Sequence, residues 1–146
     1  MAKLSYEKLI EKHRQELSDF PIAYAFSDEQ LKEALIKLEA NDISECVTVF
    51  NHGDIVKKEN APKLINMFKN HRKEIRDALL SDEEFAEAAF LYEMDNHEYA
   101  INWDGDDDVL ACFGLEFDEL SELGLESAYL RAANKHHKKM IEWGVI

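Results

Sequence analysis

Residues 81–103, SDEEFAEAAFLYEMDNHEYAINW, contain the change of pattern that decides the predicted fold class. The stretch begins with a capping box, in which Ser81 and Glu84 can bond the free backbone N–H groups at the start of a helix. Apolar residues then recur at helical spacing. From His97 to Trp103, successive side chains instead alternate between two faces, which is typical of a β-strand. The stretch therefore predicts a helix followed by a strand, with Trp103 and His97 on the same face.

The sequence on both sides shows the same mixture of helical and strand-like segments. Helices are expected at residues 3–18, 27–40, 62–80 and 126–143, with short ones at 109–113 and 118–123. Strands are expected within residues 20–26 and in a hairpin over residues 46–56. No linker or repeat divides the chain, so we predict one domain over residues 1–146. The predicted class is a helix-rich α+β fold, with about six helices packed on a small, mainly antiparallel sheet of about 3–4 strands.

The formal net charge of −14 is concentrated in one part of the chain. Residues 77–126 contain 17 acidic residues and no Lys or Arg, whereas residues 1–76 contain 13 acids and 13 bases. Residues 127–146 are net positive because they contain Arg131, Lys135, Lys138 and Lys139. A folded segment as acidic as residues 77–126 produces a strong negative field.

This acidic segment favours a non-enzymatic interaction protein that binds a basic protein, of the inhibitor or DNA-mimic type. Direct nucleic-acid binding is disfavoured because phosphates would meet a negative surface. The candidate interaction residues are Asn96, His97, Glu98, Tyr99, Asp104, Asp106, Asp107, Asp108, Glu116, Asp118 and Glu119. A third reading is a homo-oligomer, in which the acidic face of one copy pairs with the basic C-terminal helix of another.

The aspartates of residues 104–108 suggest an alternative, a small metal-binding protein or enzyme centred on this loop and on His97 and Glu98. An EF-hand loop starting at Asp104 would need Gly and Glu where Val109 and Leu115 stand, so the calcium motif fails. A looser carboxylate site for a divalent cation stays open. The other interpretation is a solvated turn whose acids favour the start of the next helix.

His97 and Glu98 look like the opening of an HExxH zinc helix, but the second histidine is replaced by Ile101. On a strand, His97 and Glu98 would face opposite sides and could not act on one substrate atom. A functional His97 would need acids from elsewhere, such as Glu93 or Asp95. No catalytic residue or cofactor is therefore predicted, and an enzyme is the less favoured reading.

The sequence contains no motif for several other kinds of site. Cys46 and Cys112 are far apart and form no CxxC pair, and there is no Gly-rich phosphate loop or GxSxG elbow. The longest apolar run is far too short to span a membrane, and the start of the chain resembles no signal peptide. We expect a cytoplasmic protein that does not contact membranes. His13 is expected in the core, and the adjacent His136 and His137 in solvent.

Three segments, residues 20–30, 90–99 and 108–115, together resemble a family of small proteins of unknown function from bacteria and their phages. The shared features are an aromatic-rich segment, an Asn-His-Glu-Tyr box and an Asp-containing turn before a Leu-Gly-Leu-like helix end. Here the helix end reads CFGL at residues 112–115, which departs slightly. The resemblance spans roughly residues 20–120 and implies no activity, but it makes the box at residues 96–99 the first to test.

Overall fold

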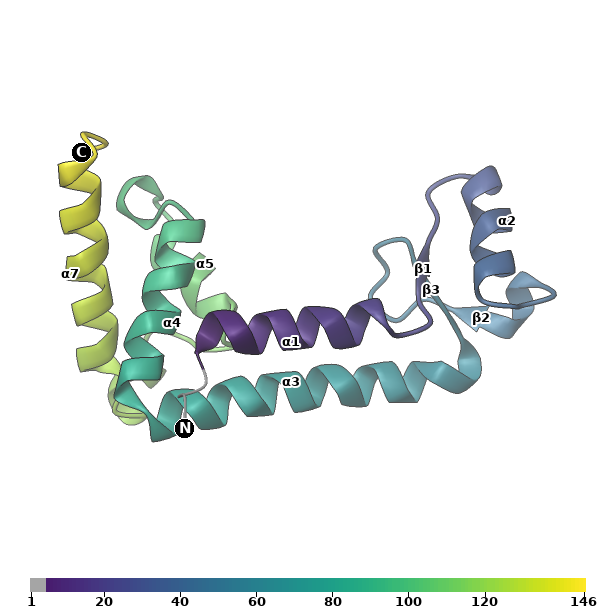
Figure 1. The fold of residues 1–146 in the computed structure, drawn as a ribbon, viewed down its shortest axis with the longest axis horizontal. Helices are drawn as coiled ribbons and strands as arrows, with labels where there is room; N and C mark the ends of the chain where they lie inside the picture. The colour runs from purple at the N-terminus through teal and green to yellow at the C-terminus, as the bar shows by residue number, and fades with distance from the viewer. Residues whose placement is uncertain (1–4) are drawn as a thin grey trace. The chain divides into compact units, whose positions relative to one another are not determined.

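The computed structural model describes residues 5–146 and confirms the predicted helix-rich α+β class (Figure 1). Its helices are α1 (Tyr6–Ser18), α2 (Asp28–Lys37), α3 (Ala61–Ser81), α4 (Glu83–Asn96), α5 (Gly105–Ala111), α6 (Glu119–Glu122) and α7 (Glu126–Glu142). Its strands are β1 (Ala23–Tyr24), β2 (Cys46–Val47) and β3 (Asp54–Lys57). Short 3-10 turns are η1 (Ile43–Glu45), η2 (Lys58–Asn60) and η3 (Tyr99–Ile101). No helix within residues 5–146 is long and apolar enough to cross a bilayer.

The elements form two compact units whose boundary passes through α1 and α3. One unit is Lys12–His71, and the other joins the residues up to Glu11 with Arg72–Ile146. We call them the sheet unit and the helical unit. The expectation of one domain over the whole chain stays a prediction.

The sheet unit is built around β3, which pairs antiparallel with β1 on one side and β2 on the other. The β2–β3 hairpin confirms the strand pairing expected within residues 46–56. Ser27 caps α2 by accepting the backbone N–H of Gln30 at 3.2 Å. His13 is buried as expected, and its ring stacks on His71 with centroids 3.8 Å apart.

The helical unit has the larger core, in which α4 and α7 pack against each other. Phe90 on α4 is fully buried and contacts the rings of Phe113 and Tyr129 edge to face. The N-terminal turn of α1 contributes Tyr6 and Leu9 to the same core. These side chains hold the end of α4 and the whole of α5 in place, which positions the site described below.

The strand expected at residues 97–103 is wrong. Helix α4 continues to Asn96, His97 is its C-cap, and Glu98 turns the chain with a left-handed φ of +52°. Alternation alone cannot form a strand, because its backbone N–H and C=O groups also need a neighbouring strand to bond. The described strands all lie in the sheet unit. Trp103, which the predicted strand placed on one face with His97, is fully exposed.

Two helices near this stretch begin at residues other than those predicted. Ser81 is the last residue of α3, and the N-cap of α4 is Asp82, whose carboxylate accepts the N–H groups of Glu84 and Phe85. Helix α5 begins at Gly105 instead of residue 109, so the acids of the loop occupy its first turn. There they interact favourably with the positive end of the helix dipole.

Replacing Glu98 with glutamine should leave the free energy of unfolding within about 0.5 kcal/mol of the parent, because Glu98 is exposed and makes no capping hydrogen bond. Urea denaturation followed by circular dichroism measures this. The matched change Glu98→Val should destabilise by about 1–2 kcal/mol, because a β-branched residue tolerates a left-handed conformation poorly. Equal effects of the two changes would contradict the turn at Glu98.

Candidate functional site

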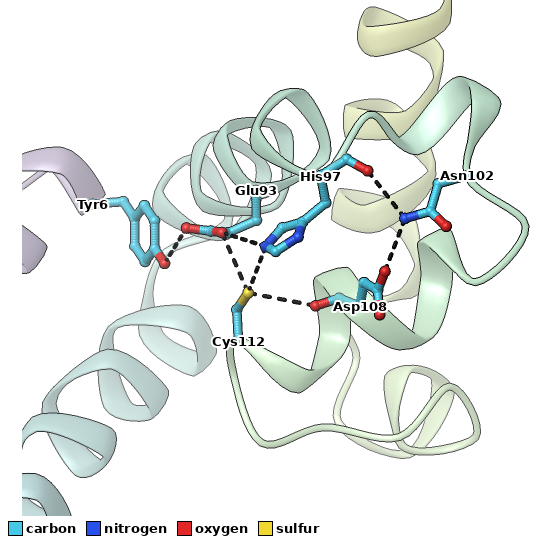
Figure 2. Close-up of polar contacts among 6 residues, drawn as sticks. All are labelled: Tyr6, Glu93, His97, Asn102, Asp108 and Cys112. Atoms are coloured by element: carbon cyan, nitrogen blue, oxygen red, sulfur yellow. Dashed lines mark hydrogen bonds and ion pairs between the residues drawn. The ribbon is translucent and has the colours of Figure 1, made fainter. Parts of the chain in front are cut away.

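Three ligand-type side chains of the helical unit converge where α4 ends and α5 ends. Glu93 and His97 stand four residues apart, so the last turn of α4 carries both on one face. Cys112, the C-cap of α5, completes the group. Figure 2 shows the three side chains pointing toward one another. We call these residues the Glu93 cluster.

The three polar atoms of the Glu93 cluster form a nearly equilateral triangle. Glu93 Oε2 lies 3.3 Å from His97 Nε2, and Cys112 Sγ lies 3.3 Å from each of these two atoms. The other carboxylate oxygen, Oε1, accepts a 2.8 Å hydrogen bond from the Tyr6 hydroxyl (Figure 2). Glu93 is buried, His97 is partly exposed and Cys112 is exposed, so the triangle is open to solvent on one side.

A second group of hydrogen bonds holds the backbone around the cluster. The Asn102 side-chain amide donates to the backbone carbonyl of His97 at 3.1 Å and to Asp108 Oδ2 at 2.8 Å (Figure 2). Asn102 thereby links the end of α4 to the first turn of α5. The Cys112 thiol also lies 3.4 Å from the carbonyl of Asp108.

The cluster is not arranged as a nucleophilic triad. Although the residue as a whole is exposed, partial desolvation of its sulfur and the adjacent Glu93 carboxylate raise the pKa of Cys112 to about 12, so the sulfur is a neutral thiol at physiological pH. In a triad, nucleophile and carboxylate contact different nitrogens of the histidine. Here both face Nε2 of His97. The convergence on one point is the arrangement of a ligand set.

The sequence singled out His97 and named Glu93 as one acid that could support it. The structure places these two together, while Asp95, the other acid named, bonds His136 and Lys139. Cys112 was missed because it is 15 residues from His97. The i,i+4 spacing of Glu93 and His97 could have identified Glu93. This spacing places two side chains side by side only in a helix, and helix α4 extends to Asn96.

The other residues predicted for a site do not join the Glu93 cluster. Asn96 and Glu98 are exposed at the end of α4. Asp106 accepts hydrogen bonds from the hydroxyls of Tyr99, at 2.7 Å, and Tyr129, at 2.5 Å. Asp108 is bonded to Asn102. Asp106 and Asp108 therefore have separate partners, and within residues 5–146 the acids of the 104–108 loop form no group of ligand atoms close enough to share a metal ion.

A second feature of the helical unit is an acidic surface with exposed aromatic residues. Trp103 is fully exposed, and Ile101 and Phe117 are 56% and 57% exposed. Trp103 and Phe117 line a shallow hollow together with Asp104, Asp106 and Asp107. We call these residues the Trp103 surface, which comprises Ile101, Trp103, Asp104, Asp106, Asp107 and Phe117.

Three basic residues of α7 neutralise acids of α4 in the same chain. Glu87 bonds Arg131 at 2.6 Å and Lys135 at 2.5 Å, and Lys139 bonds Asp95 at 2.5 Å. The bond from Lys135 is the main reason that the pKa of Glu87 is lowered, although burial opposes it. The acids of α4 are thus largely paired.

The acids that follow α4 have no such partners. Among residues 5–146, no Lys or Arg forms an ion pair with the acids of residues 98–126. These acids are Glu98, Asp104, Asp106, Asp107, Asp108, Glu116, Asp118, Glu119, Glu122 and Glu126. The negative field expected from the sequence is therefore strongest around α5 and α6.

The expectation that His136 is solvated is wrong. His136 is 1% exposed, its Nδ1 lies 2.7 Å from Asp95 Oδ1, and its Nε2 accepts the N–H of Ala100 at 3.0 Å. Because Nε2 accepts, the ring hydrogen is on Nδ1 and is donated to Asp95. His136 therefore satisfies the backbone of η3 and is structural.

A comparison with protein families gives a match over most of the chain. A family model described as "Family of unknown function (DUF7659)" matches residues 5–136. No curated protein and no solved structure matches the chain.

Proposed function

The chain belongs to DUF7659, a family of unknown function, and from its own surface we propose that it is a non-enzymatic acidic protein that binds a basic protein. One observation supports this proposal most directly. Trp103 is fully exposed, and the acids around it have no Lys or Arg partner among the described residues. The binding site is the Trp103 surface.

An exposed tryptophan beside other apolar residues supports a protein partner. Tryptophan is the residue type most enriched at the centres of protein interfaces, where a polar rim surrounds an apolar anchor. In this chain the anchor is Trp103, flanked by the exposed Ile101 and Phe117. The rim is acidic, with Asp104, Asp106 and Asp107 lining the same hollow as Trp103. The complementary partner has an apolar pocket bordered by Lys and Arg.

Part of this surface is already fixed before a partner binds. The hydroxyls of Tyr99 and Tyr129 both donate to Asp106, which holds the first turn of α5. Burial and the hydrogen bond to Asp106 raise the pKa of Tyr99 to about 12, so its hydroxyl remains a donor at physiological pH. A fixed surface loses less conformational entropy on binding.

The setting we propose is the cytoplasm of a bacterium or of its phage-infected host, with a nucleic-acid-handling protein as partner. Such partners are basic because they bind phosphates. Inhibition by DNA mimicry is one version, in which the carboxylates around α5 and α6 occupy the positions of phosphates.

The test compares the parent with Trp103→Ala in parallel pull-downs from one native lysate, each washed at low and then at high salt. We expect a basic protein that the parent retains at low salt and loses at high salt, because ionic attraction is screened. With that protein purified, Trp103→Ala should weaken binding by roughly 30-fold, corresponding to about 2 kcal/mol for an aromatic anchor.

Two variants complete the experiment. Trp143→Ala removes another exposed tryptophan outside the Trp103 surface and should leave binding unchanged. The pair Asp104→Asn and Asp107→Asn should slow association and reduce its salt dependence. Competition by duplex DNA would favour the mimic version. Equal recovery by the parent and Trp103→Ala, or recovery of no basic protein, would refute the proposal.

A further inference from the structure

We propose that Glu93, His97 and Cys112 bind one Zn²⁺ ion, with the fourth coordination position open to water or a small anionic ligand. The three side chains supply one oxygen, one nitrogen and one sulfur from two helix ends (Figure 2). This site is separate from the Trp103 surface and does not depend on the function proposed for it.

The separations between the three ligand atoms match those around tetrahedral zinc. Zinc bonds of about 2.0–2.3 Å at tetrahedral angles place neighbouring ligand atoms roughly 3.3–3.6 Å apart. Each of the three separations in the Glu93 cluster is 3.3 Å. An ion above this triangle can reach all three atoms with little movement of the side chains.

The direction of the contacts also favours an ion. A neutral histidine nitrogen either carries one hydrogen or offers one lone pair. His97 Nε2 faces both Glu93 and Cys112, and the Cys112 thiol donates to Glu93, so the three contacts share at most two hydrogens when His97 is neutral. A cation held between the three atoms satisfies them together.

The buried carboxylate of the cluster favours a cation. Glu93 is 6% exposed, and among the described residues no Lys or Arg pairs with its carboxylate; the base beside it is His97, at 3.3 Å, which is charged only when protonated. Buried carboxylates in proteins are normally paired with a base or coordinated to a metal. The unpaired acids of residues 98–126 lie in the same unit and add a negative field that concentrates cations.

The cluster has the supporting contacts that metal sites use. The Tyr6 hydroxyl bonds Glu93 Oε1 at 2.8 Å, which leaves Oε2 directed toward His97 and Cys112. Such partners orient a ligand and commonly raise metal affinity by about 10–100-fold. Asn102 fixes the backbone of His97 from the other side.

The donor set selects zinc over the hard cations. Calcium and magnesium prefer sites made wholly of oxygen, whereas a thiolate with imidazole and carboxylate suits Zn²⁺. Binding forms three coordinate bonds and releases the Cys112 thiol proton to solvent, with no change of oxidation state. Three protein ligands with an open position are typical of catalytic zinc, and four protein ligands of structural zinc.

The test is titration of the untagged, metal-stripped chain with zinc chloride, followed by calorimetry and by thermal unfolding. We expect one zinc per chain and a rise in Tm with zinc concentration. Cys112→Ser and His97→Ala should each weaken zinc binding at least 100-fold, and Tyr6→Phe by about 10-fold. His52→Ala, a change of an exposed histidine in the sheet unit, should bind like the parent.

Cobalt(II) provides a second readout. The parent should show a thiolate-to-cobalt charge-transfer band that Cys112→Ser lacks while its metal-free circular dichroism spectrum matches the parent. Zinc binding that survives both Cys112→Ser and His97→Ala would overturn the proposal. Absence of stoichiometric zinc binding, or equal losses in His52→Ala, would overturn it too.

Discussion

Replacing Phe90 with alanine is expected to lower the free energy of unfolding by about 3–5 kcal/mol, the largest effect of any change considered for this protein. Phe90 is fully buried, and its ring lies 5.2 Å from the ring of Phe113 and 5.2 Å from that of Tyr129. Removing it leaves a cavity and two broken aromatic contacts at the centre of the helical unit. Urea denaturation followed by circular dichroism gives the change directly.

The matched control is Trp103→Ala, which deletes a still larger aromatic side chain. Because Trp103 is fully exposed, the change should alter the free energy of unfolding by no more than about 0.5 kcal/mol. A large loss in Trp103→Ala, or a small one in Phe90→Ala, would show that the core is placed differently. The same Trp103→Ala protein serves the binding test, so its stability must be known.

Replacing Asp54 with asparagine is expected to destabilise the protein by about 2–3 kcal/mol at neutral pH. Asp54 is 1% exposed and is the first residue of β3. Its carboxylate accepts the backbone N–H groups of Val49 at 2.8 Å, Phe50 at 3.1 Å and His52 at 3.2 Å, as well as the Thr48 hydroxyl at 2.9 Å. Asparagine presents an NH₂ group to some of these donors, so N–H groups would face each other.

The stability difference between the parent and Asp54→Asn should depend on pH. Burial alone would raise the pKa of Asp54. The hydrogen bonds from the backbone N–H groups of the loop and from the Thr48 hydroxyl outweigh burial, so the pKa falls from 3.8 to about 2. A carboxyl whose pKa is lowered on folding stabilises the protein fully above its unfolded pKa. That contribution, about 2 kcal/mol, is lost as the pH falls from about 4 toward 2.

The measurement is urea denaturation of both proteins between about pH 7 and pH 2.5. The control is Asp107→Asn, an exposed position on α5, which should change stability by at most about 0.5 kcal/mol at every pH. A difference between the parent and Asp54→Asn that stays constant down to pH 2.5 would contradict the role assigned to the carboxylate.

Local signals in the sequence were enough for most of the secondary structure. The Ser27 cap, the β2–β3 hairpin and the long helices α1, α3 and α7 follow from hydrogen bonds and apolar periodicity within a few residues. Such signals need no knowledge of distant neighbours. The helix-rich α+β class and the uneven charge were accessible for the same reason.

The segment from His97 to Trp103 required the tertiary structure. Its alternating pattern fits a strand, but a strand forms only where another can bond its backbone. Here the backbone is instead satisfied by its own turn, by Asn102 on the carbonyl of His97 and by His136 on the N–H of Ala100. Side chains that the predicted strand placed on one face therefore lie in three different places: the core, the Glu93 cluster and solvent.

By itself, then, the sequence determined the helices, the hairpin and the acidic field, and it singled out His97 as a residue to test. Only the tertiary structure decided that Cys112 meets Glu93 and His97, and that Trp103 is exposed beside unpaired acids. The physical reason is the distance along the chain over which each kind of interaction acts. Helix caps and periodicity act over one or two turns, whereas the cluster and the Trp103 surface depend on how α4, α5 and η3 pack.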